Sequence, residues 1–202
     1  MKIINLKTDY QTAQLAQEEA LVNVINGGEE TLFLNELDDV YTAGTSANAA
    51  TDYFNKDIPL VETGRGGQIT YHGPGQIVAY PIIDLKTRTQ DLKLYISNLQ
   101  DWIINTLAHF DIKAFKTDDV GVWVKDEFGN TKKIAAIGIR VRKWVTFHGI
   151  ALNVNPDLEK FNGIVPCGIT QHGVTSIASI LNKDIDLEEV EEVLVEEFSK
   201  IF

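Results

Sequence analysis

The only cysteine of the 202-residue chain, Cys167, lies in residues 163–169, which read GIVPCGI. Proline and glycine beside the sulfur predict a bend in the chain rather than a helix or a strand. A thiol in such a loop is a candidate nucleophile, because a thiolate attacks acyl carbon atoms once a neighbouring group has taken or balanced its proton. A lone cysteine is also a common small core residue, so an inert buried thiol stays open as the alternative.

Lys133 is the candidate for the group that generates this thiolate. A lysine does so either as an ammonium that stabilises the sulfur anion or as a neutral amine that accepts the proton. Residues 134–138, IAAIG, are small or apolar and would desolvate the amine of Lys133, which favours its neutral form. Adjacent Lys132 competes for the same role, and a solvated lysine at a strand end is the alternative for either residue.

A glycine-rich stretch, residues 64–76 (GRGGQITYHGPGQ), precedes the apolar run 77–83. Glycine lets a ligand approach the main chain closely, and Arg65 and His72 are the side chains of this stretch that carry charge or transfer protons. We therefore expect it to form part of an active site. A pair of tight turns around an ordinary hairpin is the alternative.

The tetrapeptide Thr70-Tyr71-His72-Gly73 has a near-repeat at residues 146–149, TFHG. Residues two apart on a strand share a face, so each copy predicts a threonine and a histidine that point together and line one pocket. Histidines that satisfy local hydrogen bonds are the alternative. We expect no metal, because two imidazoles without a thiol or carboxylate at ligand spacing make a poor catalytic site and no C-x-x-C or H-E-x-x-H motif occurs.

Composition limits the class of protein. A chain with 44% hydrophobic residues can bury a full core, so residues 1–202 are expected to form a single domain, and we expect a monomer. The net charge of −11 argues against general binding to nucleic acid. One cysteine excludes an internal disulfide and suits a reducing compartment, and no signal peptide or membrane-spanning run is apparent, so a cytoplasmic location is expected.

Periodicity predicts an α/β fold, a mixed β-sheet covered by helices. Helices are expected at residues 9–26, along the apolar stripe from Leu92 to Phe110, and after Asp186, which has the N-cap pattern with Glu189. Strands are expected near residues 31–34, 68–83, 120–125, 132–142 and 144–154, with a hairpin turn at 126–130.

Basic residues gather in one acid-free stretch of this acidic chain: Lys132, Lys133, Arg140, Arg142 and Lys143. Such a patch would attract an acidic protein, and Arg140 and Arg142 should project from one strand face. A solvated hairpin face is the alternative.

Four motifs taken together resemble the octanoyltransferase LipB family: residues 65–76, 133–138, 146–154 and the Pro-Cys-Gly of 166–168. The resemblance extends from about residue 31 to about residue 180, in the same order and spacing. It implies a catalytic domain related to those of biotin and lipoate protein ligases. It also implies transfer of an octanoyl or lipoyl group from octanoyl-acyl carrier protein to the acceptor lysine of lipoyl domains, the first step of endogenous protein lipoylation.

The resemblance assigns roles to residues of this chain. Cys167 would carry the acyl group as a thioester, and Lys133 would lower the cysteine pKa and act as acid or base. The implied substrate-binding residues are Arg65, Gly66, Gly67, Gln68, Ile69, Thr70, Tyr71, His72, Ala136, Ile137, Gly138, His148, Gly149, Ile150 and Ala151.

The implied partners are octanoyl-acyl carrier protein, the lipoyl domains of 2-oxoacid dehydrogenase complexes and the glycine cleavage H protein. No cofactor is expected, because attack of an amine on a thioester is downhill without a nucleotide. The alternative enzyme is an ATP-dependent lipoate or biotin protein ligase, which activates its acid as an adenylate and needs no nucleophilic cysteine. A non-catalytic module that binds carrier or lipoyl domains is a third reading.

Overall fold

A computed structural model describes residues 1–164 and 173–202 of the chain. Its main feature is a seven-stranded sheet, in which the one parallel pair among the described strands is β1 with β2. The strands follow one another across the sheet in the order β1 (Lys2–Thr8), β2 (Thr31–Leu37), β6 (Gln76–Ile82), β10 (Val145–Asn153), β9 (Thr131–Arg142), β8 (Val122–Lys125) and β7 (Ala114–Phe115).

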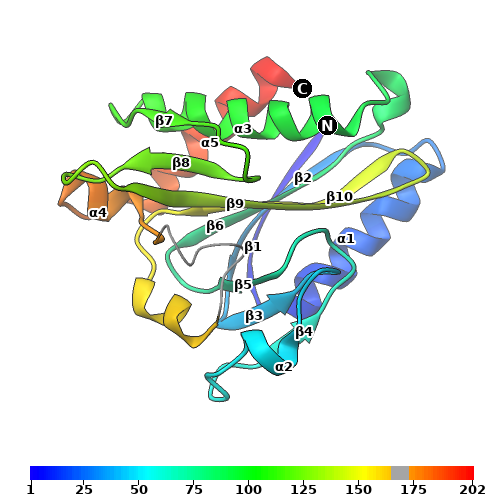
Figure 1. The fold of residues 1–202 in the computed structure, drawn as a ribbon. Coiled ribbons are helices and arrows are strands. Elements are labelled where there is room, and N and C mark those ends of the chain that lie inside the picture. Colours follow the sequence, from blue (N-terminus) through cyan, green and yellow to red (C-terminus); the bar gives the residue numbers. More distant parts are fainter. Residues whose placement is uncertain (165–172) are drawn as a thin grey trace.

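Helices cover both faces of this sheet (Figure 1). Helices α3 (Leu92–Ala108) and α5 (Leu187–Ile201) lie on one face, and α1 (Tyr10–Ile25) lies on the other. The short helices are α2 (Ala49–Asp52), η1 (Leu85–Thr87), η2 (Leu158–Gly163) and α4 (Ile177–Leu181). The expected mixed sheet with helical cover is confirmed.

Aspartates begin the three long helices. The side chains of Asp9, Asp91 and Asp186 accept hydrogen bonds from main-chain N–H groups of the first turns of α1, α3 and α5. Such caps satisfy donors that have no partner inside the helix, and each is worth about 1 kcal/mol. They explain why helices begin where the sequence predicts them.

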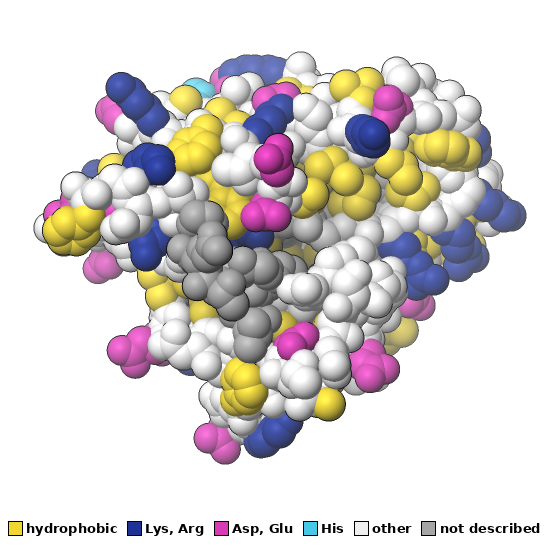
Figure 2. All heavy atoms as spheres, viewed as in Figure 1, with side chains coloured by type: hydrophobic (Ala, Val, Ile, Leu, Met, Phe, Trp, Pro, Cys, Tyr) yellow, Lys and Arg dark blue, Asp and Glu magenta, His cyan; other side chains and the backbone are white. Residues whose placement is uncertain are grey.

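The outer surface is mixed in character. Figure 2 shows apolar side chains along the upper margin of a hollow in the middle of one face, and basic side chains toward the right. Within the part of the chain that the structure covers, no helix is both long and apolar enough to cross a membrane.

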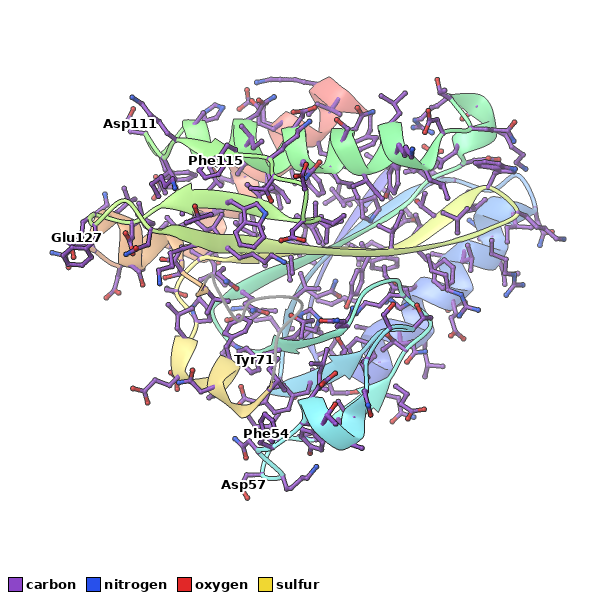
Figure 3. All side chains as sticks on the ribbon, viewed as in Figure 1. Phe54, Asp57, Tyr71, Asp111, Phe115 and Glu127 are labelled. Carbon is purple, nitrogen blue, oxygen red and sulfur yellow. The ribbon has the colours of Figure 1, made fainter. Side chains whose placement is uncertain are left out.

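A second sheet of three strands packs beside the first. Its order is β4 (Leu60–Glu62), β3 (Val40–Ala43), β5 (Ile69–His72), with β3 parallel to β4 and antiparallel to β5. Tyr41 and Tyr71 are fully buried in it, and Figure 3 places Tyr71 between the large sheet and the outer loop that carries Phe54 and Asp57. Figure 1 shows this small sheet on the same side of the large sheet as α1.

The single strand expected over residues 68–83 is wrong. The chain turns at residues 73–75, where Gly75 has a φ of +85° that favours glycine. This turn ends β5 in the small sheet and starts β6 in the large one. The segment expected as one strand therefore contributes one strand to each of the two sheets.

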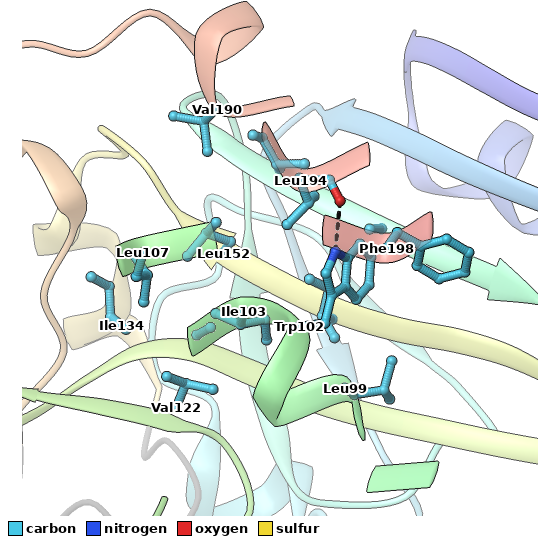
Figure 4. Packing of buried hydrophobic residues seen from close by; sticks show 14 of the residues in the cluster. Leu99, Trp102, Ile103, Leu107, Val122, Ile134, Leu152, Val190, Leu194 and Phe198 are labelled. Carbon is cyan, nitrogen blue, oxygen red and sulfur yellow. Dashed lines mark hydrogen bonds between the residues drawn. The ribbon is translucent and has the colours of Figure 1, made fainter. Parts of the chain in front are cut away.

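The core under α3 and α5 holds the large sheet in place (Figure 4). Trp102 is fully buried, and its indole N–H donates to the carbonyl of Leu194 at 2.7 Å, which joins the two helices. Phe198 packs against the same indole, with ring centroids 4.9 Å apart. Burying each such side chain contributes about 1.5–3 kcal/mol, so this core fixes the central strands β6, β9 and β10 of the large sheet.

Candidate active site

A cavity of about 380 Å³ lies where the small sheet, β6, β9, β10 and the first residue of α1 meet. Its walls include Tyr10 of α1, Arg65 and His72 around β5, and Lys133 of β9. The glycine-rich stretch, the residues after Lys133 and the residues after His148 are far apart in sequence, and the fold brings parts of all three to this one cavity.

A β-bulge turns Lys133 toward the cavity. Lys133 is paired with Trp123 and Ala135 with Val122, so Ile134 is an extra residue on β9. Strict alternation from Ala135 would place Lys133 on the face covered by α3, but the extra residue moves its side chain to the opposite face. Ile134 instead packs in the core under α3.

The ammonium of Lys133 is held in a largely enclosed position. Its side chain is 8% exposed, and Nζ lies 4.7 Å from the ring centroid of Trp123, within the range of a cation–π interaction. A Cβ on Gly121 would lie 2.9 Å from Cε of Lys133, so glycine there leaves room for the lysine stem. Lys132 is paired with Val124, whose side chain belongs to the α3 core, and it does not line the cavity.

The main chain of Lys133 is bonded to the residues that follow the undescribed segment. Its N–H donates to the carbonyl of Gly173 at 3.0 Å, and its carbonyl accepts from the N–H of Thr175 at 2.9 Å. Val174, between these two, lines the cavity, as does Phe161 shortly before the segment. Cys167 itself lies outside the described residues.

Arg65 ties the glycine-rich loop to the small sheet. Its guanidinium donates to the carbonyl of Thr42 at 2.6 Å, to the hydroxyl of Thr42 at 2.9 Å and to the carbonyl of Gly66 at 3.0 Å. Main-chain bonds from Thr45 to Arg65 and from Ser46 to Gly67 hold the same loop. The buried cation thus braces the wall of the cavity and adds positive charge beside it.

His72 and His148 both line the cavity and are buried. Burial, together with the nearby charge of Arg65, lowers the pKa of His72 to about 3 and that of His148 to about 4. Both imidazoles are therefore neutral at pH 7. Nδ1 of His72 and Oε1 of Gln76 are buried without a hydrogen-bond partner among the described atoms.

The two histidine motifs differ in geometry. Thr70 and His72 both line the cavity, as expected for residues two apart on a strand. The equivalent expectation for Thr146 and His148 is wrong, because His148 has a φ of +55°, which breaks the alternation. His148 stacks on Phe147 with ring centroids 5.0 Å apart, while the hydroxyl of Thr146 donates to the carbonyl of Pro81.

Most of the predicted binding residues line the cavity, and two do not. Gly66 contacts β9 instead, where its N–H donates to the carbonyl of Ile139 at 2.9 Å. Tyr71 points away into the small sheet's own core, and its hydroxyl donates to Asp39. The predicted residues that do line it are Arg65, Gly67, Gln68, Ile69, Thr70, His72, Ala136, Ile137, Gly138, His148, Gly149, Ile150 and Ala151.

Sequence reasoning missed a second set of lining residues. Alternation along β6 could have revealed three of them, since Gln76, Val78 and Tyr80 share one face of that strand. No sequence pattern indicated that Tyr10 lines the cavity, because its position depends on how α1 packs on the sheet. The missed lining residues are Tyr10, Ser46, Gln76, Val78, Tyr80, Asp119, Val120, Asn153, Phe161 and Val174.

The predicted basic patch divides into two parts. Arg140, Arg142 and Lys143 are exposed at one end of β9, whereas Lys133 is buried near the other end. Lys143 and Trp144 form the two-residue turn to β10, both with positive φ. The exposed patch is therefore smaller than expected and lies at the hairpin tip.

Comparison with known proteins identifies the family. The model of the lipoyl protein ligase A/B catalytic domain matches residues 9–199. An octanoyltransferase of Rickettsia canadensis is 49% identical over 199 residues, with 96% of this chain and 95% of that protein covered. An octanoyltransferase of Paramagnetospirillum magneticum is 48% identical and covers the whole of this chain and 95% of its own length. The chain belongs to the octanoyltransferase family. It is an acyltransferase.

The fold of this octanoyltransferase-family chain is that of lipoate and biotin protein ligases. A bipartite lipoate protein ligase of Thermoplasma acidophilum superimposes with a TM-score of 0.78 at 20% identity, covering 99% of this chain and 82% of that one. The biotin protein ligase of Aquifex aeolicus gives a TM-score of 0.63 at 17% identity, covering 98% and 69%. These two likenesses concern the fold, whereas the family membership rests on the sequence relatives.

Proposed function

We propose that this enzyme transfers an octanoyl group from octanoyl-acyl carrier protein to the acceptor lysine of lipoyl domains, through a thioester on Cys167. Lipoyl transfer from the same kind of donor is included. The observation that carries the proposal is the placement of Lys133, buried at the cavity and bonded through its main chain to residues 173 and 175. These follow Cys167 closely in the chain.

In the first step, the Cys167 thiolate attacks the carbonyl carbon of the carrier-bound octanoyl thioester. A new C–S bond forms to Cys167, and the bond to the carrier sulfur breaks. The departing thiolate takes a proton from the ammonium of Lys133. Main-chain N–H groups of the glycine-rich loop are suited to stabilise the oxyanion formed during this step.

In the second step, the amine of the acceptor lysine attacks the Cys167 thioester. The C–N bond of the amide forms, the C–S bond breaks, and the neutral amine of Lys133 accepts the proton that the incoming amine loses. Lys133 is then an ammonium again and balances the regenerated thiolate. One lysine serves both steps, and no nucleotide takes part.

The neutral imidazoles of His72 and His148 suit binding rather than proton transfer. With pKa values lowered to about 3 and about 4, neither is an acid at pH 7. They offer hydrogen bonds to the polar end of the acyl group, while Val78, Ile150 and Ala151 supply apolar wall.

The ATP-dependent ligase is the weaker reading. It is favoured by fold likeness to ligases at 20% identity or less, whereas relatives at 48–49% identity are octanoyltransferases. We further propose that the chain works as a single catalytic domain and as a monomer in the cytoplasm, where the thiol stays reduced. Its acceptors would be the lipoyl domains of 2-oxoacid dehydrogenase complexes and the glycine cleavage H protein.

The test is the intact mass of the protein after mixing with octanoyl-acyl carrier protein without nucleotide. Wild type should gain one octanoyl group that hydroxylamine removes, and Cys167→Ser should gain no such hydroxylamine-labile group. The label should pass to an unmodified lipoyl domain on its addition. Activity that needs free octanoate and ATP, with no adduct from the carrier, would support the ligase instead.

A further inference from the structure

The exposed members of the cavity lining mark its mouth. They are Ser46, Gly67, Asp119 and Val120. The first two are held together by the main-chain bond between them, and the other two lie in the loop of residues 116–121, which joins β7 to β8. Among the described residues that line the cavity, Asp119 carries the one carboxylate. Figure 2 shows acidic side chains at the upper margin of the hollow.

The loop of residues 116–121 is braced at several points. The amide N–H of Asp119 donates to the hydroxyl of Thr117 at 3.2 Å, and this hydroxyl donates to the carbonyl of Asp119 at 3.1 Å. The indole N–H of Trp123 donates to the same carbonyl at 3.2 Å. At the start of the loop, the ammonium of Lys116 donates to the hydroxyl of Ser97 on α3 at 2.7 Å. Asp119 is therefore held at the mouth by contacts on both sides of it.

The same loop passes beside Lys133. A Cβ on Gly121 would lie 2.9 Å from Cε of Lys133, and Asp119 is two residues before this glycine. Two residues of chain span at most about 7 Å, so the main chain of Asp119 is near that of Gly121. The indole of Trp123 links the two charged residues, because its ring face supports the ammonium of Lys133 and its N–H holds Asp119. A group bound by Asp119 is therefore close to the proposed acid–base group.

Charge indicates which substrate this carboxylate would bind. Arg65 is a buried cation in the cavity wall, and Lys133 is another whenever it holds its proton. In the proposed reaction the octanoyl thioester is neutral, whereas the acceptor lysine is an ammonium at pH 7, because its usual pKa is about 10.4. The positive wall repels this ammonium, and a carboxylate at the mouth attracts it.

We propose that Asp119 binds the ammonium of the acceptor lysine at the mouth of the cavity. This inference rests on the proposed function and adds the group that admits its second substrate. The carboxylate accepts a charge-assisted hydrogen bond from the ammonium. The lysine then loses one proton to water at the exposed mouth, and its neutral amine moves on to attack the Cys167 thioester. The further proton that the amine loses on attack goes to Lys133.

Asp118 provides a matched control. It is the neighbouring aspartate, it is also exposed, and it is not among the described residues that line the cavity. Asp118→Asn removes the same charge from the same loop as Asp119→Asn. General electrostatic attraction of the acceptor therefore predicts equal effects of the two changes, whereas direct binding of the lysine predicts an effect of Asp119→Asn alone.

A double-mutant cycle measures the contact itself. The probes are a recombinant unmodified lipoyl domain and the same domain with its target lysine replaced by methionine, each titrated against the full-length enzyme by NMR. Asp119→Asn should weaken binding of the unmodified domain about fivefold, the upper range for an exposed ion pair. Its effect on the methionine domain, and both effects of Asp118→Asn, should stay within about twofold. Equal effects of Asp119→Asn on the two domains, or no effect on either, would overturn the proposal.

Kinetics test the consequence for transfer. Asp119→Asn should raise the KM for the unmodified lipoyl domain about fivefold, in line with the binding change. The rate of acyl-enzyme formation from octanoyl carrier protein is measured in the same variants. An equal loss in that step would overturn the proposal, because the acceptor takes no part in it.

These readouts separate the two proposals. The cycle measures binding without turnover, so if no acyl-enzyme forms in wild type, the proposed function fails while the cycle still shows whether Asp119 contacts the lysine. If the acyl-enzyme forms normally and the cycle shows no coupling, the proposal for Asp119 fails alone.

Discussion

Lys133 and Trp123 face each other across β8 and β9, with the lysine Nζ 4.7 Å from the centroid of the indole ring. The ring supports the ammonium in a place where little water reaches it, since both residues are at least nine-tenths buried. A cation–π contact of this kind is worth about 0.5–2 kcal/mol. The position of the proposed acid–base group therefore depends on an aromatic residue that is not among the cavity-lining side chains.

Replacement of this ring should slow acyl transfer. We expect Trp123→Leu to lower kcat about tenfold, because about 1.4 kcal/mol of support for the ammonium is lost. Trp123→Phe keeps a ring face, so its kcat should lie between those of Trp123→Leu and wild type. The measurement is single-turnover acylation from octanoyl carrier protein, with circular dichroism as the control for folding. Equal rates for the Leu and Phe variants would contradict a role for the ring.

The two neighbouring lysines should differ sharply. Lys133→Ala should reduce acyl-enzyme formation by about 10²–10⁴, the usual contribution of a positioned acid–base group. Lys132→Ala is the matched control and should stay within about threefold, because its side chain is on the opposite face of the sheet. If Lys132→Ala lost more activity than Lys133→Ala, Lys132 rather than Lys133 would be the acid–base group, and the argument from the bulge would be wrong.

The buried histidines should make the protein sensitive to acid. His72 has a pKa of about 3 when folded and about 6.5 when unfolded, so the unfolded chain binds more protons between these values. The free energy of unfolding should therefore fall as the pH drops below about 6.5, and this histidine should cost about 2 kcal/mol between pH 7 and pH 5. Urea unfolding of wild type and His72→Gln at both pH values checks this. The variant should lose less stability on acidification, and an equal loss would contradict the assignment.

Carrier docking should depend on salt. Arg140, Arg142 and Lys143 are exposed at the tip of the β9–β10 hairpin in a chain of net charge −11. Raising the ionic strength tenfold, from about 0.05 M to about 0.5 M, should raise the KM for octanoyl carrier protein several-fold through screening. The KM for a small octanoyl thioester should not change. Arg142→Glu should produce the same selective increase at low salt, and an equal response of both substrates would contradict docking at this tip.

Gly149 lines the cavity, and we expect it also to be needed for the stability of the fold. A Cβ at this position would come within van der Waals overlap of the main-chain oxygen of Ala79 on β6, so part of the sheet would have to move. We expect Gly149→Ala to lower the free energy of unfolding by about 1–3 kcal/mol, the usual cost of overpacking. Gly66→Ala is the control, because its Cβ would meet only an ordinary contact at 3.6 Å. Thermal unfolding of the two variants compares these costs, and equal stability would contradict the packing argument.

Local patterns predicted the long elements well. The helix expected at residues 9–26 is α1 (Tyr10–Ile25), with Asp9 as its N-cap, and the helix after Asp186 is α5 (Leu187–Ile201). These succeed because capping and apolar periodicity act within a few residues. Strands β8, β9 and β10 were also expected within two residues of their observed ends.

Features that depend on distant contacts were missed. β1 (Lys2–Thr8) and the small sheet were not expected, since short strands gain their stability from neighbours that the sequence does not reveal. The direction of Lys133 could not be read from alternation, because it depends on a bulge opposite β8. Likewise the place of Tyr10 at the cavity depends on the packing of α1.

The bulge at Ile134 makes the site depend on the register in which β9 pairs with β8. Extra residues in the exposed turn of residues 126–130 would leave the pairing of Lys133 with Trp123 in place. If Ile134 instead paired opposite Trp123, the strand would return to strict alternation and the ammonium would turn into the hydrocarbon core beneath α3. A one-residue slip in the pairing of β8 with β9 would therefore act as the loss of a functional group, although every residue of the site is retained.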